Sequence, residues 1–195
     1  MKKWATILVI FITIFATFIG CQKRESTKEE IYKEFQKKIV TMSSYKCIAK
    51  VEAIGNKSTH NYVFTHNYIK SDYYKLEVLE PENLKGKTIE YKGDRVIITN
   101  PDINDKIELP NTYDNRQYYF IGDFIKNYLQ SEEVDIKLSN NSLVLETIIP
   151  GGNKYFTKQV LYVNKESKNP EKMEILNSEG RVNFTVNYRN FECEK

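Results

Sequence analysis

The residue types that most often carry catalysis or bind metals are sparse in this sequence. It has two histidines, His60 and His66, and three cysteines. The histidines lie six residues apart in one predicted strand, so their side chains share a face but are separated by about 20 Å. All ligands of one zinc ion must lie within about 2–2.3 Å of the metal. We therefore expect no metal site at the histidines, and nothing else in the sequence indicates a cofactor.

Short catalytic motifs are also missing. The sequence contains no Cys-x-x-Cys, His-Glu-x-x-His or Gly-x-Ser-x-Gly run. The glycines of PGGNK (150–154) lie between two predicted strands, whereas a phosphate-binding loop needs a following helix N-terminus. We interpret PGGNK as a hairpin turn, and the adjacent Glu132 and Glu133 as solvated. Distant carboxylates could still form a glycosidase pair in space, but the sequence favours a binding or regulatory protein over an enzyme.

Cys21 stands at an abrupt change of composition. Lys2 and Lys3 precede an uncharged run over 4–19, and the chain becomes polar directly after Cys21. A basic start, an apolar run and a small residue, Gly20, are typical of an export signal. The run of roughly 16 residues makes a helix of about 24 Å, shorter than the roughly 30 Å hydrocarbon core of a bilayer. The alternative is an uncleaved single-span anchor.

The four residues Phe18-Ile19-Gly20-Cys21 resemble the bacterial lipobox. In that motif a diacylglycerol is transferred to the cysteine sulfur, and the chain is cleaved before the cysteine and acylated on its new amino group. Phe18 departs from the leucine usual at the first position. The resemblance implies a signal peptide over 1–20, lipidation of Cys21 with chains such as palmitate, and a tether over 21–27. Since two or more acyl chains hold a protein stably on a membrane, we expect a lipoprotein on the outer face of a bacterial cell membrane.

The remaining residues, 28–195, are predicted to form one domain with two helices. Thr27 and Glu30 form a capping box at the start of the first helix. That helix has apolar residues at helical spacing, and a second helix is predicted over 117–130. Alternation with a period of two predicts strands over 45–53, 62–68, 72–80, 105–110, 141–150, 154–164, 171–177 and 180–188, with a hairpin over 87–99 that turns at Lys92-Gly93-Asp94.

Short turns without crossover helices indicate an antiparallel sheet. We predict an α+β, mainly β fold in which a long curved sheet carries both helices on its concave side. The formal net charge of +3, to which Lys2 and Lys3 contribute two, is spread over the chain. Because a nucleic-acid binder needs a concentrated basic face, we expect no nucleic acid as a partner.

Cys47 and Cys193 remain after Cys21 is assigned to lipid. Each lies in a strand-like segment near one end of the predicted domain. Outside the cell membrane a disulfide between them is permitted. Two buried, unpaired thiols are the alternative.

Partner contacts are predicted either at an exposed sheet edge or at the aromatic run Tyr118, Tyr119 and Phe120. Aromatic side chains commonly anchor interfaces. The alternative is that these three residues pack the second helix onto the sheet. Edge pairing or strand exchange between two copies would produce a homodimer.

Two segments resemble the outer-membrane lipoprotein-carrier (LolA-like) superfamily. The stretch 79–110, LEPENLKGKTIEYKGDRVIITNPDINDKIELP, has that superfamily's Pro, Leu-Lys-Gly turn, hairpin and second Pro. The stretch 169–192, NPEKMEILNSEGRVNFTVNYRNFE, is similar to its closing hairpin. The resemblance covers nearly the whole exported domain and implies a half-open antiparallel barrel with helices across its concave side.

An anchored chain of this kind looks most like the germination-specific lipoprotein family GerS of spore-forming clostridia. That resemblance implies a non-enzymatic partner of a cortex N-acetylmuramoyl-L-alanine amidase, CwlD, a zinc enzyme that makes muramic-δ-lactam. It also implies a place between the forespore and mother-cell membranes or in the spore. The alternative function is a carrier or sensor that holds lipid or lipoprotein acyl chains in the concave face; an undetected hydrolase is a third.

Overall fold

The computed structural model describes residues 26–70, 73–103, 105–111, 120–131, 135–139 and 141–195. Two α-helices are α2 (Lys28–Thr41) and α3 (Ile121–Gln130), and two short 3-10 helices are η1 (Glu82–Leu84) and η2 (Pro101–Ile103). The strands are β1 (Ser44–Ile54), β2 (Thr59–Ile69), β3 (Tyr73–Glu80), β4 (Thr88–Lys92), β5 (Arg95–Asn100), β6 (Asp105–Pro110), β7 (Asp135–Leu138), β8 (Ser142–Asn153), β9 (Phe156–Asn164), β10 (Pro170–Leu176) and β11 (Val182–Glu194).

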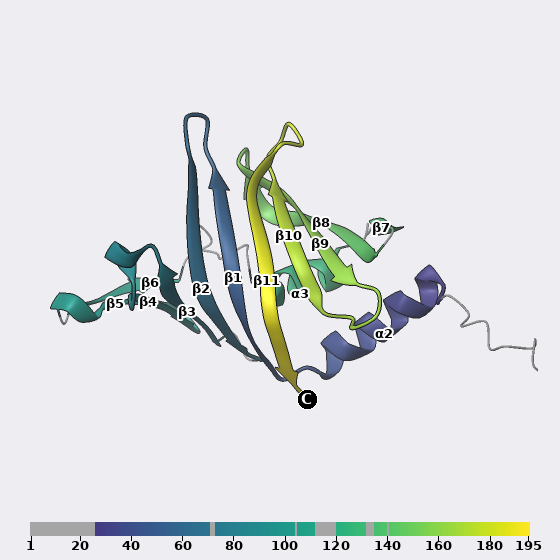
Figure 1. Ribbon diagram of the computed structural model, residues 1–195, viewed down its shortest axis with the longest axis horizontal. Helices are drawn as coiled ribbons and strands as arrows, with labels where there is room; N and C mark the ends of the chain where they lie inside the picture. Colours follow the sequence, from purple (N-terminus) through teal and green to yellow (C-terminus); the bar gives the residue numbers. More distant parts are fainter. Residues whose placement is uncertain (1–25, 71–72, 104, 112–119, 132–134, 140) are drawn as a thin grey trace, which may run out of the picture.

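All strands belong to one antiparallel sheet in the order β6-β5-β4-β3-β2-β1-β11-β10-β9-β8-β7. The first and last strands along the chain, β1 and β11, lie side by side and join two meanders. The sheet is strongly curved, with α2 and α3 on its concave side (Figure 1). This confirms the mainly β fold class and the half-open barrel implied by the LolA-like resemblance.

Strand alternation decides which side chains reach the core. In β1, Tyr45, Cys47, Ala49 and Val51 are buried, while Lys46 and Lys50 between them are exposed. Directly paired residues of neighbouring strands share a face, so the whole sheet has an apolar concave face. The convex face carries charged residues and is solvated.

Helix α2 forms where the capping box predicted it. The Thr27 hydroxyl accepts a hydrogen bond from Glu30 N at 3.2 Å, and Thr27 N donates to the Glu30 carboxylate at 2.9 Å. The predicted apolar stripe is buried against the sheet, with the members Ile31, Phe35, Ile39 and Met42.

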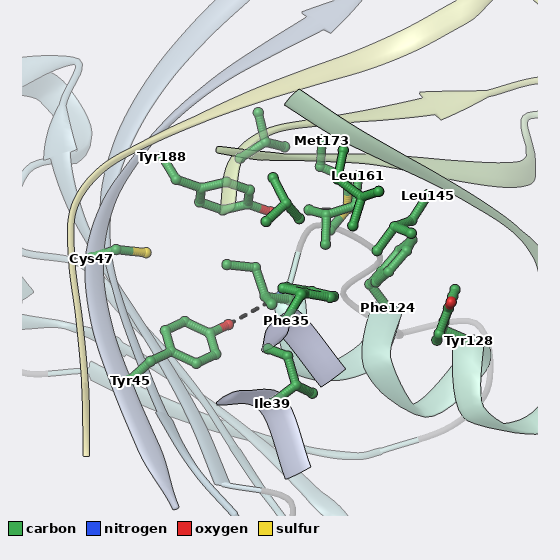
Figure 2. Close-up of a cluster of buried hydrophobic side chains, with 14 of the residues drawn as sticks. Phe35, Ile39, Tyr45, Cys47, Phe124, Tyr128, Leu145, Leu161, Met173 and Tyr188 are labelled. Atoms are coloured by element: carbon green, nitrogen blue, oxygen red, sulfur yellow. Dashed lines mark hydrogen bonds between the residues drawn. The ribbon is translucent and has the colours of Figure 1, made fainter. Parts of the chain in front are cut away.

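One large cluster of buried side chains fills the space between the sheet and both helices. In Figure 2, Phe35 of α2 and Phe124 of α3 lie among residues of the sheet, including Leu145, Leu161 and Met173. Phe124 and these three sheet residues have no exposed surface at all. The concave face is therefore closed by protein side chains where the helices cover it.

Three details of the strand prediction were wrong. β7 was not predicted, because four residues give too short a pattern. The β8–β9 turn lies at Lys154 and Tyr155, since β8 continues through an irregular stretch between Ile148 and Asn153. β11 extends beyond the predicted end at 188 to Glu194, which pairs with Ser44 of β1.

Candidate functional site

Helix α3 docks onto three neighbouring tyrosines of the sheet, which we call the tyrosine platform: Tyr45 of β1, Tyr68 of β2 and Tyr74 of β3. The ring centroids of Tyr45 and Tyr68 are 5.1 Å apart, and those of Tyr68 and Tyr74 are 5.0 Å apart. The rings stand side by side because their residues are directly paired across the strands.

The tyrosine platform supplies polar partners to the first turn of α3. The Tyr45 hydroxyl accepts a buried hydrogen bond from Ile121 N at 3.1 Å, and Figure 2 shows this hydroxyl directed toward the helices. Burial raises the pKa of Tyr45 well above its ordinary value. The Tyr74 hydroxyl donates to the Asp123 carboxylate at 3.1 Å. The first amides of a helix have no partner within it. The bond from Ile121 N to Tyr45 supplies one, and the bond from Tyr74 to Asp123 holds the same turn on β3.

Gly122 allows this close approach. A Cβ at Gly122 would lie 2.8 Å from the Tyr74 hydroxyl oxygen and 2.9 Å from a ring carbon of Tyr68. Both distances are under 3.0 Å, which real Cβ atoms essentially never show, so a side chain at this position requires the two tyrosine rings or the helix to shift. The sequence alone gave no signal for this role of Gly122.

We expect Gly122→Ala to destabilise the domain by about 1–3 kcal/mol, because overpacking displaces the Tyr68 and Tyr74 rings. The sign of the change is informative, because Gly122 is the second residue of α3 and helix propensity alone would favour alanine over glycine there. Chemical unfolding measures the difference. Lys126→Ala, at an exposed position of the same helix, is the matched control and should change stability little. An unchanged or raised midpoint for Gly122→Ala would contradict the packing described here.

Phe120 lies directly before α3 and is completely buried. Its ring centroid lies 4.5 Å from that of Tyr74 and 4.8 Å from that of His66. In this structure Phe120 packs the start of the helix onto the sheet and offers no surface to a partner. Tyr118 and Tyr119, predicted together with it as contacts, lie outside the described residues.

The two helices are also joined to each other. The Tyr128 hydroxyl of α3 donates to the Tyr32 hydroxyl of α2 at 2.5 Å, and Gln36 donates to the same oxygen at 2.6 Å. The preceding residue of α3, Asn127, donates from its buried side-chain amide to the Gln159 side chain of β9 at 2.9 Å. These polar contacts, which periodicity does not reveal, hold α2, α3 and β9 in one arrangement.

His66 of β2 is buried in an aromatic environment with no exposed surface. Its ring is flanked by Phe120, Phe64 and Tyr188. Neither ring nitrogen has a hydrogen-bond partner among the described residues. Desolvation lowers the pKa of His66 to about 3, so the ring is neutral. His60, by contrast, is exposed near the end of the same strand.

Cys47 and Cys193 are both free. Cys47 is buried and directly paired with His66 across β1 and β2, and burial raises its pKa to about 12. Cys193 is half-buried and paired with Tyr45. No disulfide joins them in this structure, and only Cys47 is fully buried; whether the two thiols pair stays a prediction.

The described residues contain no group of three or more histidine, cysteine, aspartate or glutamate side chains arranged to hold a metal ion. Within the same ranges, no helix is both long and apolar enough to span a bilayer. Cys21 and the segment before it are not among them.

Surface features suited to a partner are found at the two edges of the sheet. β6 and β7 each have a neighbour on one side only within the described chain. Exposed apolar residues lie at both edges, Ile107 and Leu109 on β6 and Leu138 on β7.

A hollow of about 470 Å³ lies among the β1–β2, β8–β9 and β10–β11 turns, which meet at one end of the molecule (Figure 1).

Comparison with known proteins links the chain to sporulation. The GerS lipoprotein, in the structure of the CwlD amidase from Clostridioides difficile in complex with GerS, is 62% identical. That match covers 88% of this chain and 98% of the GerS chain, with a TM-score of 0.55. An uncharacterised conserved protein from Thermus thermophilus, 14% identical, has the same fold over 87% of this chain and 89% of its own, with a TM-score of 0.51.

A curated relative, sporulation protein YdcC from Bacillus subtilis (strain 168), is 21% identical over 201 residues that include all of this chain. The chain spans 59% of the length of that relative. The family model described as sporulation protein YdcC-like matches residues 1–195. Since this match extends over the whole sequence, the chain belongs to the sporulation protein YdcC-like family.

Proposed function

We propose that this protein is a membrane-anchored, non-enzymatic lipoprotein that binds and activates a cortex N-acetylmuramoyl-L-alanine amidase of the CwlD type. In this role it permits muramic-δ-lactam formation and later spore germination. The observation that carries the proposal is the 62% identity to GerS, which was solved in a complex with CwlD, over 98% of the GerS chain. The zinc ion of the reaction belongs to the amidase.

The geometry supports a binding role. Both edges of the sheet are open within the described chain and carry exposed apolar residues. An extended segment of a partner can pair with such an edge. A homodimer formed by strand exchange or edge pairing belongs to the same proposal.

The packed core supports the amidase partner over a carrier of acyl chains. Where α2 and α3 cover the sheet, the concave side is filled by side chains with no exposed surface, such as Phe124, Leu145 and Leu161. An acyl chain would have to displace a helix to enter. Mass spectrometry of an organic extract of the purified protein tests this directly, because stoichiometric lipid beyond the anchor would favour the carrier.

Lipidation of Cys21 would place the domain on the outer face of a cell membrane, between the forespore and mother-cell membranes or in the spore. The proposal assigns 1–20 to a cleaved signal peptide, 21–27 to the tether and 28–195 to the domain. The described domain begins its first helix at Lys28, so only a short tether separates it from the bilayer.

We expect residues 22–195 to co-elute with the amidase in size-exclusion chromatography with light scattering, and to raise amidase activity on cortex peptidoglycan. Tyr118→Ala combined with Tyr119→Ala should weaken binding by about 2 kcal/mol or more if this aromatic pair anchors the interface. Tyr155→Ala removes a tyrosine that is 54% exposed on the β8–β9 turn and serves as the matched control. Separate peaks at micromolar concentrations, or unchanged activity, would reject the amidase as a partner.

A further inference from the structure

Three turns of the sheet enclose the hollow of about 470 Å³ at one end of the molecule. Its described lining residues come from these turns and the adjoining strand ends, and not from the edge strands β6 and β7. β1 extends over 11 residues from Ser44, beside the end of α2, to Ile54 at the hollow, a length of about 35 Å. The hollow therefore lies at the far end of the sheet from the junction with α2 (Figure 1). Its volume is typical of a site for a small ligand, roughly 300–1,000 Å³.

Side-chain amides in the lining hold two of these turns together. Asn183 Nδ2 of β11 donates to Tyr155 O of the β8–β9 turn at 2.9 Å, and Asn177 Nδ2 donates to Asn183 Oδ1 at 3.3 Å. Ser178 N of the β10–β11 turn donates to Lys154 O at 3.0 Å. Each of the two amides uses one of its two N–H groups in these bonds, so the other remains for a ligand. The walls are therefore held in place before any ligand binds.

A glycine of the PGGNK stretch makes the tight β8–β9 turn possible. A Cβ at Gly152 would lie 3.0 Å from Ile149 O and would collide with Phe156 O, so the two strands can approach this closely only with glycine here. The turn places Lys154 and Tyr155 at the rim of the hollow. Tyr155 is 54% exposed, and the Lys154 ammonium lies 4.9 Å from the centroid of its ring. The rim thus presents an aromatic ring and a cation side by side.

The hollow carries one positive charge in excess. Two cations line it, Lys154 and Arg181, together with one carboxylate, Glu179, and two positive charges with one negative charge leave +1. Arg181 forms an ion pair with Glu179. Lys154 forms no ion pair within the described part of the chain. A ligand that brings a single carboxylate to Lys154 would therefore complement the charge of the hollow.

We infer that this hollow binds an acidic amino sugar of a glycan strand. A pyranose ring has an apolar face of C–H bonds, which matches the exposed aromatic ring of Tyr155. The hydroxyl and acetamido groups of an amino sugar donate and accept hydrogen bonds, as do the amides of Asn177 and Asn183. A carboxylate on the same sugar pairs with Lys154, so each part of the ligand has a partner in the hollow.

Other classes of ligand match the lining less well. For a hydrocarbon chain, the stacked rings of Phe156 and Phe184, with centroids 5.5 Å apart, are interrupted by amides and charged groups. A nucleic acid requires a concentrated basic face, whereas the excess here is one charge. An extended peptide pairs with an open strand edge, and the strands that border the hollow have neighbours on both sides.

The proposed function identifies the sugar, and this step rests on it. An N-acetylmuramoyl-L-alanine amidase hydrolyses the amide between the lactyl carbonyl of N-acetylmuramic acid and the nitrogen of L-alanine. Water supplies the hydroxyl of the new carboxyl group and a proton to the released amine. The amide was neutral, whereas the freed lactyl group is a carboxylate at neutral pH. The hollow therefore prefers the peptide-free strand, so the protein holds the product of its partner.

The test uses the full chain, solubilised from bacterial membranes in detergent, and saturation-transfer NMR of two disaccharides. N-acetylglucosaminyl-N-acetylmuramic acid carries the free lactyl carboxylate. N,N′-diacetylchitobiose has two rings with the same acetamido groups but no carboxylate, and is the matched control. We expect the acidic disaccharide to bind about fivefold more tightly, which is the upper value for one solvent-exposed ion pair. Equal affinities, or no transfer to the acidic disaccharide at millimolar concentration, overturn the inference.

Two substitutions at the rim assign the contacts, and both change exposed side chains, so the unfolding midpoint should stay at the wild-type value. Lys154→Gln keeps a long polar side chain without the charge, and should lower the affinity for the acidic disaccharide to that for the neutral one. Tyr155→Ala should weaken the binding of both about tenfold. Lys57→Gln removes an exposed lysine of the β1–β2 turn that does not line the hollow, and should change neither. Wild-type affinities in both rim variants would contradict the site.

The outcome is separate from that of the amidase experiment. Tyr155→Ala should still co-elute with the amidase while it loses affinity for the disaccharides. Co-elution of a wild-type protein that binds neither disaccharide would remove this inference alone. Binding of the acidic disaccharide without co-elution would remove the amidase as a partner and keep the acidic-sugar site.

Discussion

Lowering the pH from 6.5 to 5 should destabilise the folded domain by about 2 kcal/mol through His66 alone. The pKa of His66 is lowered from 6.5 to about 3 in the folded chain because burial desolvates the ring, and neither ring nitrogen has a hydrogen-bond partner among the described residues. In the unfolded chain the ring titrates near its ordinary pKa. Between these two values the unfolded state binds the extra proton, so stability falls as the pH falls, by up to about 1.4 kcal/mol per pH unit.

The measurement is chemical unfolding of the wild type and of His66→Phe between pH 7.5 and 5. His66→Phe should remove this part of the pH dependence and be no less stable at pH 7.5, because it eliminates two buried nitrogens that lack partners. His60→Gln, which changes the exposed histidine of the same strand, should keep the wild-type slope. Parallel pH profiles for the wild type and His66→Phe would contradict the neutral, buried state of His66.

Replacing Cys21 with serine should transfer the protein from the membrane fraction to the soluble fraction. A hydroxyl cannot replace the thiol that receives the diacylglycerol, and cleavage of a lipobox requires that modification. Without acyl chains, the proposed anchor is lost. Fractionation of the producing cells, together with incorporation of labelled palmitate, measures the effect.

Cys193→Ser is the matched control, because it removes a half-buried thiol of the domain and should leave the protein on the membrane and labelled. The two variants together separate lipidation from a general effect of cysteine loss. A Cys21→Ser protein that stays wholly with the membrane and carries no label would favour the uncleaved span over 4–19 as the anchor.

Local patterns in the sequence predicted most of the elements. The capping box at Thr27 and Glu30, the stripe of α2 and the alternation in β1 report directly on neighbouring residues in the chain. Gly93, with a φ of 60°, occupies the turn of the β4–β5 hairpin as predicted. β7 escaped because a four-residue strand at an edge has too few alternations to be distinguished from a loop.

Contacts between distant residues were not predictable in the same way. Phe120 is separated from Tyr74 and His66 by more than 40 residues of sequence, and the pairing of β2 with β3 and the docking of the start of α3 bring the three rings together. The even spacing of His60 and His66 correctly indicated a shared face. It could not tell that one lies in the core and the other in solvent.

The sequence by itself determined the two helices, the antiparallel sheet, the candidate lipid attachment at Cys21 and the scarcity of catalytic motifs, because each depends on residue type and local spacing. The tertiary structure decided that Phe120 packs inside, that Gly122 admits α3 to the tyrosine platform, and that β6 and β7 lie at the two edges of the sheet within the described chain. These properties depend on strand order, register and curvature, which arise from packing among residues far apart in the chain.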